Sequence, residues 1–281
     1  MRTLAFRRYE NGELSVSGCP ALSGTAALFG SFSPPDENLF KTLLAAHTLK
    51  KEGAGRVVAV VPFLAYMRQD KAKPGLSLTT AWLGELIRAS GIGRIVTVDL
   101  HSRRDQDLVP VPIVSVSPAS VFAKEIRARG WEDATLVAPD NGAVARCEAV
   151  ARALTDARPV TRFEKARTAR GVRVDAPVGA VGNRCVLVDD QLDTGSTLVA
   201  ACERLRRAGA KELLICVTHG LFAGEAWKRL RGLGVREIVV TDTVATRPPA
   251  AWISQISVAP LIEKAIASIP PSRRVRVHPI S

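Results

Sequence analysis

The strongest chemical signal in this sequence is a run of acidic and hydroxyl side chains at residues 189–197. The run reads Asp-Asp-Gln-Leu-Asp-Thr-Gly-Ser-Thr, and it lies between an apolar stretch typical of a strand and an amphipathic stretch typical of a helix. Backbone N–H groups and hydroxyls of residues 194–197, at a helix N-terminus, can hold a phosphate. Asp189 and Asp190, at the strand end, can accept hydrogen bonds from vicinal sugar hydroxyls. The run predicts a ribose phosphate site; an acidic helix cap without a ligand is the alternative.

Further polar residues also follow apolar runs. They are Arg68-Gln69-Asp70, His101, Asp140, His219 and residues 241–243. In open parallel sheets, ligands bind beyond the carboxyl ends of the strands. We therefore expect these side chains to gather at the ligand-binding edge of a parallel sheet.

The elements that must position these residues alternate along the chain. Nearly continuous apolar runs typical of buried parallel strands cover residues 56–63, 94–100, 134–139, 185–190, 212–219 and 237–243. Helix-patterned stretches lie at residues 36–53, 77–91, 117–130, 142–154, 196–209 and 224–234. This alternation predicts an α/β fold.

Domain organisation follows from the break at residues 109–118, which separates two groups of strands. We place a boundary near residue 115, giving domains 1–115 and 116–281, and we allow for the last helix packing back on the first domain. Residues 161–183 carry many cations and glycines with little apolar periodicity. This segment predicts a loop.

Composition narrows the classes of partner. The net charge of +12, from 39 Lys and Arg against 27 Asp and Glu, favours phosphorylated metabolites, nucleotides or nucleic acid. Aromatic residues make up only 5%, without basic-aromatic interleaving, so we expect no nucleic acid partner. No apolar run reaches the length of about eighteen residues that a bilayer needs, so we expect a cytoplasmic protein without membrane contact. The five scattered cysteines predict buried thiols.

Residues 188–197 resemble the phosphoribosyl-binding signature shared by type I phosphoribosyltransferases and ribose-phosphate diphosphokinases. The motifs that resemble the diphosphokinases in order and rough spacing lie at residues 61–71, 98–101, 139–142, 163–167 and 218–220. The resemblance implies two similar phosphoribosyltransferase-like domains, each with a mainly parallel sheet flanked by helices, one on the ATP side and one on the ribose 5-phosphate side. It also implies transfer of the β,γ-diphosphate of MgATP to ribose 5-phosphate, which gives 5-phosphoribosyl 1-diphosphate for nucleotide biosynthesis.

The same resemblance implies roles for individual residues. Those expected to hold ribose 5-phosphate are Asp189, Asp190, Asp193, Thr194, Gly195, Ser196 and Thr197. Those expected to bind ATP are Tyr9, Asn11, Glu13, Arg68, Gln69 and His101. Those expected to be catalytic are the loop cations Lys165 and Arg167, together with His101. Asp140 and His101 are the expected Mg²⁺ residues.

The segment from Tyr9 to Glu13 is implied to serve the neighbouring subunit, so we expect a homo-oligomer, either a dimer or a hexamer built as a trimer of dimers. Three alternatives stay open. A non-catalytic or regulatory paralogue is suggested by the eight residues before Tyr9, where family members usually have a strand and a helix. A phosphoribosyltransferase would not need Arg68-Gln69, His101 and Lys165 together. Nucleic-acid binding would rest on the +12 charge alone.

Overall fold

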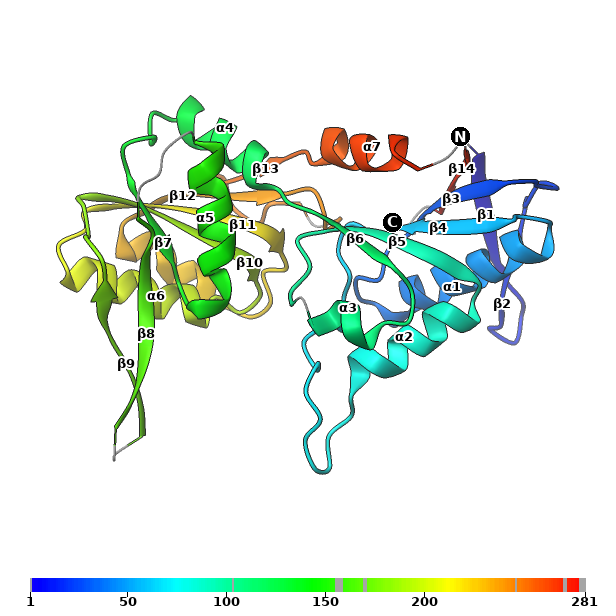
Figure 1. Ribbon diagram of the computed structural model, residues 1–281, viewed down its shortest axis with the longest axis horizontal. Coiled ribbons are helices and arrows are strands. Elements are labelled where there is room, and N and C mark those ends of the chain that lie inside the picture. Colours follow the sequence, from blue (N-terminus) through cyan, green and yellow to red (C-terminus); the bar gives the residue numbers. More distant parts are fainter. Residues whose placement is uncertain are drawn as a thin grey trace. The chain divides into compact units, whose positions relative to one another are not determined.

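A computed structural model describes residues 2–102, 104–154, 159–168, 171–245, 247–269 and 272–277, with the backbone alone at 2, 164–168, 171–176 and 272–277. The chain forms two compact units (Figure 1). Unit 1 comprises Met1–Val116 and Ala259–Ser281, and unit 2 comprises Ser117–Val258. Helix α7 (Ala259–Ala267) and strand β14 (Ser272–Val277) therefore belong to the same unit as the N-terminal residues. The division into functional domains at residue 115 stays a prediction.

Unit 1 is built on a seven-stranded sheet in the order β2-β1-β14-β3-β4-β5-β6. Its strands are β1 (Arg2–Arg8), β2 (Leu14–Ser17), β3 (Thr25–Phe29), β4 (Arg56–Val60), β5 (Ile92–Val98), β6 (Ile113–Val116) and β14 (Ser272–Val277). Its helices are α1 (Asp36–Lys51), α2 (Thr79–Ala89), α3 (Arg104–Leu108) and α7 (Ala259–Ala267). All neighbouring strands run parallel except the β1–β2 hairpin.

The central strands of unit 1 are apolar because helices cover both faces of the sheet. In β4, residues 57–60 are fully buried. Figure 1 shows α1 and α2 on one face and α7 on the other, where α7 contacts β5 and β6. Helix α1 starts with Asp36 and Glu37 and ends with Lys50 and Lys51, charges that favour the helix dipole.

Unit 2 has a sheet of the same size in the order β13-β12-β11-β10-β7-β8-β9. Its strands are β7 (Thr135–Ala138), β8 (Thr161–Thr168), β9 (Gly171–Val178), β10 (Arg184–Leu192), β11 (Glu212–Gly220), β12 (Val235–Thr241) and β13 (Ile253–Ile256). Its helices are α4 (Ala119–Ala128), η1 (Asn141–Ala143), α5 (Val144–Ala153), α6 (Ser196–Arg207) and η2 (Ala226–Leu233). Neighbouring strands run parallel except in the β8–β9 hairpin.

Two buried clusters cover the two faces of this second sheet. One packs α4 and α5 against side chains such as Val186 and Val188, and the other packs α6 and η2 against side chains such as Leu187. Alternate residues of β10 thus enter opposite cores, which is why its sequence is apolar without alternation.

The predicted α/β class is confirmed, whereas two local predictions are wrong. Residues 161–168 and 171–178 pair as antiparallel strands and are not a loop, with Lys165 opposite Val174 and Arg167 opposite Val172. The apolar residues of β9 alternate with charged ones, which is a strand period in a stretch whose composition is typical of a loop. Residues 226–233 form a 3₁₀ helix where an α-helix was expected.

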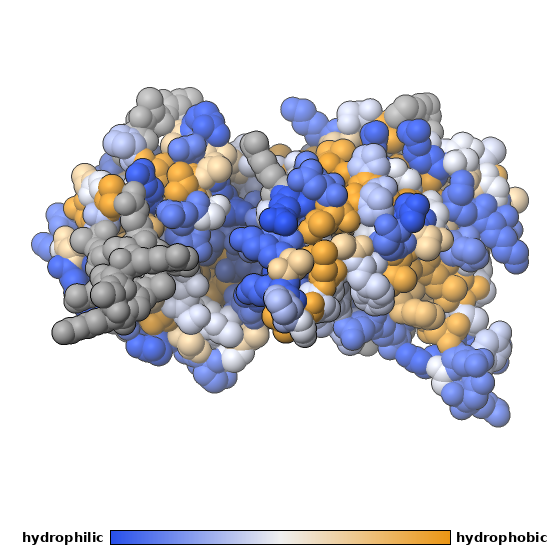
Figure 2. Space-filling model, turned by 60° about the horizontal axis from the view of Figure 1, so that its bottom comes forward, coloured by the Kyte–Doolittle hydropathy of each residue, from blue (hydrophilic) through white to orange (hydrophobic). Residues whose placement is uncertain are grey.

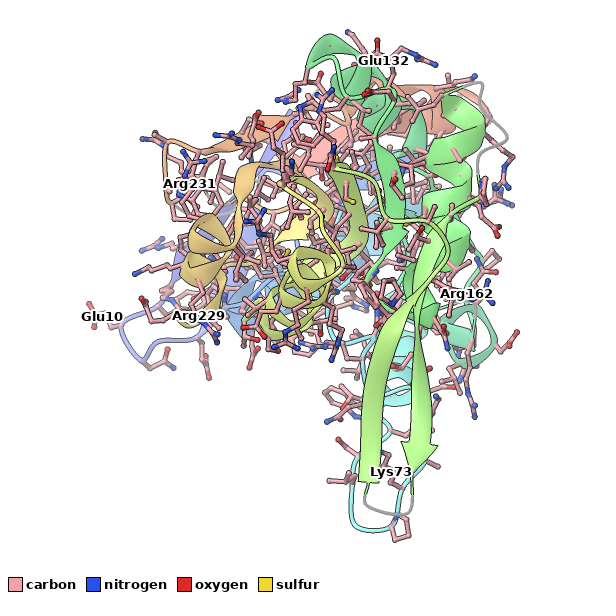
Figure 3. All side chains as sticks on the ribbon, turned by 90° about the vertical axis from the view of Figure 1, so that its left-hand side faces the viewer. Glu10, Lys73, Glu132, Arg162, Arg229 and Arg231 are labelled. Atoms are coloured by element: carbon pink, nitrogen blue, oxygen red, sulfur yellow. The ribbon has the colours of Figure 1, made fainter. Side chains whose placement is uncertain are left out.

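The surface is mixed in polarity. On the face that Figure 2 shows, apolar patches lie between hydrophilic residues. Several surface arginines of unit 2 bind carbonyl or carboxylate groups within the same unit. Arg206 donates to the Ala210 carbonyl at 2.8 Å. Arg229, which is labelled in Figure 3, forms an ion pair with Glu203 at 2.8 Å. In the described part of the chain, every helix is too short or too polar to cross a bilayer.

Candidate active site

The carboxyl end of β10 carries the acidic pair Asp189 and Asp190. The two residues are only 8% and 9% exposed, and the Asp189 carboxylate accepts the Asp190 backbone N–H at 2.9 Å. The strand continues past them, with Gln191 opposite His219 of β11. Strand β11 therefore holds the pair on one side, with Asp189 opposite Val217, whereas the pairing of β10 with β7 ends at Leu187. This position is the ligand-binding edge of the sheet.

Opposing effects act on the charge of this pair. Burial raises the pKa of Asp189 well above its usual value, and the nearby carboxylates of Asp190 and Asp140 raise that pKa further. Arg146 of α5 opposes this effect: its Nη2 atom lies 3.9 Å from Asp190 Oδ2, and its side chain is 11% exposed. Sequence reasoning missed Arg146, although it is a cation one turn into the helix that follows Asp140.

The residues after the pair form an open helix N-terminus. Thr194, Ser196 and Thr197 are exposed, and the Thr194 hydroxyl lies 3.2 Å from the Ser196 hydroxyl. Gly195 has φ 88°, and a Cβ atom there would lie 2.8 Å from Trp227 Cα. Only glycine fits this turn without strain. N–H groups in the first turn of α6, unlike those further along, have no helical carbonyl partner, so this end suits an anion.

Asp140 lies at the end of β7, where its carboxylate accepts the Ala143 N–H at 3.1 Å and so begins η1. The charge of Asp140 also raises the pKa of Asp189. His101 is exposed and follows β5 in unit 1. The Leu100 N–H just before it donates to the Ser115 hydroxyl at 3.0 Å. The predicted metal residues thus come from the two different units.

Mg²⁺ is implied by the resemblance, and the donor set suits one mode of binding it. No group of three His, Cys, Asp or Glu side chains is arranged to hold a metal in the described residues. Mg²⁺ is usually held by one or two carboxylates together with substrate phosphates. Asp140, a carboxylate that acts on the pKa of the acidic pair, fits that mode.

In unit 1, Arg68 and Gln69 lie exposed in the segment between β4 and α2. The Gln69 side-chain oxygen accepts hydrogen bonds from the Ser77 hydroxyl at 2.7 Å and from the Thr79 hydroxyl. The Thr80 N–H donates to the Gln69 carbonyl at 3.4 Å. This segment is therefore anchored to the start of α2.

The residues from Tyr9 to Glu13 form the turn of the β1–β2 hairpin. Gly12, at φ 89°, donates its N–H to the Tyr9 carbonyl at 2.9 Å, and the Asn11 side chain accepts the Glu13 N–H at 3.1 Å. Tyr9 is 53% exposed. The turn borders an open depression of about 600 Å³, and Figure 3 shows Glu10 projecting at its tip. The Tyr9 ring is thus available to a ligand.

Lys165 and Arg167 lie in β8 of the long β8–β9 hairpin, which extends from unit 2 in Figures 1 and 3. Their side chains lie outside the described part of the structure. Phe163, near the base of the hairpin, is 1% exposed and belongs to the unit 2 core. The hairpin is thus anchored at its base.

The contacts of His219 stabilise the sheet of unit 2. It is 2% exposed, and its Nδ1 atom lies 2.8 Å from the Thr243 hydroxyl. The hydroxyls of Thr241 and Thr243 also donate to the Thr218 carbonyl, at 2.6 and 3.1 Å. These contacts tie the ends of β11 and β12 together.

Two sheets of this topology, one ending in an acidic pair and a glycine turn at an open helix N-terminus, define a phosphoribosyltransferase-like enzyme. The chain matches the family models described as "N-terminal domain of ribose phosphate pyrophosphokinase" over residues 1–91 and "Phosphoribosyl transferase domain" over residues 119–243.

Full-length relatives narrow the class further. Ribose-phosphate pyrophosphokinase of Campylobacter jejuni is 32% identical over 269 residues, covering 94% of this chain and 86% of the relative. The enzyme of Chromobacterium violaceum is 33% identical, covering 90% and 78%. The crystal structure of phosphoribosylpyrophosphate synthetase from Mycobacterium smegmatis superposes with a TM-score of 0.82 at 31% identity, covering 95% of this chain and 89% of that one. The chain belongs to the ribose-phosphate pyrophosphokinase family.

Proposed function

We propose that this chain transfers the β,γ-diphosphate of MgATP to the anomeric hydroxyl of ribose 5-phosphate, giving 5-phosphoribosyl 1-diphosphate and AMP. The new bond joins the anomeric oxygen to the β-phosphorus, and the bond that breaks joins that phosphorus to the oxygen shared with the α-phosphate. The observation that carries the proposal is the acidic pair of β10 followed by the open N-terminus of α6. Carboxylates followed by a helix N-terminus suit a sugar that has vicinal hydroxyls at one end and a phosphate at the other.

On the sugar side, Asp189 and Asp190 accept hydrogen bonds from the ribose hydroxyls. The phosphate lies against the turn and the first residues of α6. The residues proposed for this phosphate and its approach are Asp193, Thr194, Gly195, Ser196 and Thr197. Because the turn is fixed by Gly195, the donors are held in place before the substrate arrives, which lowers the entropic cost of binding.

On the nucleotide side, Arg68 contacts phosphates and Gln69 contacts the purine or its ribose, while Lys165 and Arg167 stabilise the negative charge of the transition state. Asp140 and His101 are the residues proposed to hold the Mg²⁺ of MgATP. When bound, Mg²⁺ supplies charge neutralisation at the transferred diphosphate. The chain's own side chains bind and orient the two substrates.

We propose a homo-oligomer, a dimer or a hexamer built as a trimer of dimers, in which Tyr9, Asn11 and Glu13 complete the adenine site of a neighbouring subunit. The exposed Tyr9 ring at the hairpin turn supports this proposal. Sedimentation at assay concentration is the test, and a fully active monomer would exclude the shared site.

The experiment that tests the function is AMP formation from MgATP with and without ribose 5-phosphate, with the sugar product identified by mass. We expect AMP only when the sugar is present, in equal amount to 5-phosphoribosyl 1-diphosphate. A folded protein that binds ribose 5-phosphate but forms no AMP would be a non-catalytic paralogue. Transfer of the phosphoribosyl group from 5-phosphoribosyl 1-diphosphate to a nucleobase, with release of pyrophosphate, would instead indicate a phosphoribosyltransferase.

The environment of Asp189 predicts a pH dependence. As the pH falls through the raised pKa of Asp189, this carboxylate gains a proton and its interaction with the sugar weakens. Arg146→Gln removes a cation that lowers that pKa, so the decline should begin at higher pH, with an affinity at neutral pH lower by roughly tenfold, or about 1.4 kcal/mol. Calorimetric titration of ribose 5-phosphate across pH measures the change.

The substrate phosphate itself titrates at about pH 6. Asp189→Asn separates the two effects, because its profile lacks the titration of Asp189 and retains that of the substrate. Identical midpoints for the wild type and Arg146→Gln would contradict the assigned role of Arg146.

A further inference from the structure

The first turn of α1 presents two neighbouring acids, Asp36 and Glu37, to two different segments of unit 1. Asp36 accepts a hydrogen bond from the Tyr66 hydroxyl. Glu37 forms an ion pair with Arg8 at 2.7 Å and another with Lys41 at 2.5 Å. Tyr66 lies two residues before Arg68, and Arg8 lies directly before Tyr9. One helical turn therefore contacts both segments proposed to bind the nucleotide.

Tyr66 is held in an unusual conformation. Its φ of 66° lies in the left-handed region that bulky residues rarely adopt, so surrounding contacts must maintain it. The Thr80 hydroxyl reaches the Tyr66 carbonyl at 3.3 Å, and the Tyr66 hydroxyl reaches Asp36. Burial and the nearby Asp36 raise the pKa of Tyr66 to about 12, so its hydroxyl remains a donor. These contacts fix the direction in which the chain continues to Arg68.

The second acid connects the hairpin to the helix. Arg8 donates to the Gly12 carbonyl at 2.6 Å inside the turn while it pairs with Glu37. Lys41 is 2% exposed, and its ammonium lies 5.9 Å from the centre of the Phe6 ring in β1. A buried ammonium needs a charged partner, so Glu37 is held in place by Lys41 and can in turn hold Arg8.

We infer that Asp36 and Glu37 are positioning residues for nucleotide binding. Asp36 acts through Tyr66 on the Arg68–Gln69 segment of the chain's own site, and Glu37 acts through Arg8 on the Tyr9 turn proposed above to complete a neighbouring subunit's site. This inference rests on the proposed function of the two segments. It adds that the start of α1 fixes both segments to one rigid element, so nucleotide affinity depends on four side chains that do not touch the nucleotide themselves.

The proposed role of Asp36, which acts through Tyr66, is tested by Tyr66→Phe, which removes only the hydroxyl. We expect KM for MgATP to rise about tenfold, the effect of losing one charge-assisted hydrogen bond, with kcat and KM for ribose 5-phosphate within twofold of wild type. Asp36→Ala should give the same result, and the double variant should be no worse than either single one. Asp36→Asn keeps an acceptor oxygen and should retain most of the affinity.

The proposed role of Glu37, which acts through Arg8, is tested by Arg8→Ala. This substitution leaves the Glu37–Lys41 pair in place and so preserves the fold. It should also raise KM for MgATP selectively. Arg88→Ala, which breaks an exposed ion pair with Glu85 on α2, is the matched control and should change neither KM.

Different results would contradict the proposed function and the positioning roles of Asp36 and Glu37. A wild-type protein that forms no AMP would remove the proposed function, and calorimetry with ATP would still report whether Tyr66→Phe weakens nucleotide binding. An active wild type whose Tyr66→Phe and Arg8→Ala variants keep the KM for MgATP, or raise both KM values equally, would overturn the positioning inference.

Discussion

Lys165→Ala should lower turnover by about a thousandfold, because removing one cation that stabilises the transition state of phosphoryl transfer has an effect of that size. Ribose 5-phosphate should still bind, because the acidic pair of β10 and the start of α6 lie outside the β8–β9 hairpin. AMP formation at saturating substrates measures the first quantity, and calorimetry with ribose 5-phosphate measures the second.

The matched control is Arg162→Ala, an exposed cation of the same strand at the base of the hairpin (Figure 3), which should leave turnover within a few-fold of wild type. Unchanged turnover in Lys165→Ala would remove this residue from the mechanism. Loss of turnover together with loss of sugar binding would instead indicate that the substitution damages unit 2 as a whole.

The sequence predicted the central strands well because they are buried on both faces and are therefore uniformly apolar. The remaining strands were harder to predict. Strand β14 pairs with β3 between residues such as Arg273 and Ala26, almost the whole chain apart, and no local pattern encodes such a pairing. The β8–β9 hairpin was missed because charged residues interrupt its apolar ones, a composition that is typical of a loop.

The proposed site also contains residues that the sequence predicts and residues that it does not. Residues 189–197 could be recognised because strand end, turn and helix start follow each other directly in the chain. Arg146 could not, because its role depends on how α5 packs beside β10. The contact between Tyr66 and Asp36 joins residues thirty positions apart through a side-chain hydrogen bond that only the fold reveals. A binding motif that is continuous in the chain can be predicted from the sequence, whereas the side chains that hold such residues in place depend on the tertiary structure.

Gly195→Ala should have the largest effect on the sugar site. The φ of 88° disfavours any side chain, and the added Cβ would lie 2.8 Å from both Trp227 Cα and Trp227 Cβ. Left-handed strain and overpacking together should lower the free energy of unfolding by about 3 kcal/mol. Since a donor displaced by 1 Å can cost about a hundredfold, ribose 5-phosphate affinity should fall by about that factor.

Two glycines of the same unit separate the causes. Gly209 has φ 102° with no atom within 4 Å of an added Cβ, so Gly209→Ala tests backbone strain alone and should leave sugar affinity unchanged. Gly232 has open space as well and no left-handed φ, so Gly232→Ala should be nearly neutral in stability. If Gly195→Ala lost only as much affinity as Gly209→Ala, the close approach of the turn to Trp227 would have no part in forming the phosphate site. A loss confined to Gly195→Ala would mean that the backbone of η2 sets the geometry in which the first turn of α6 meets its ligand.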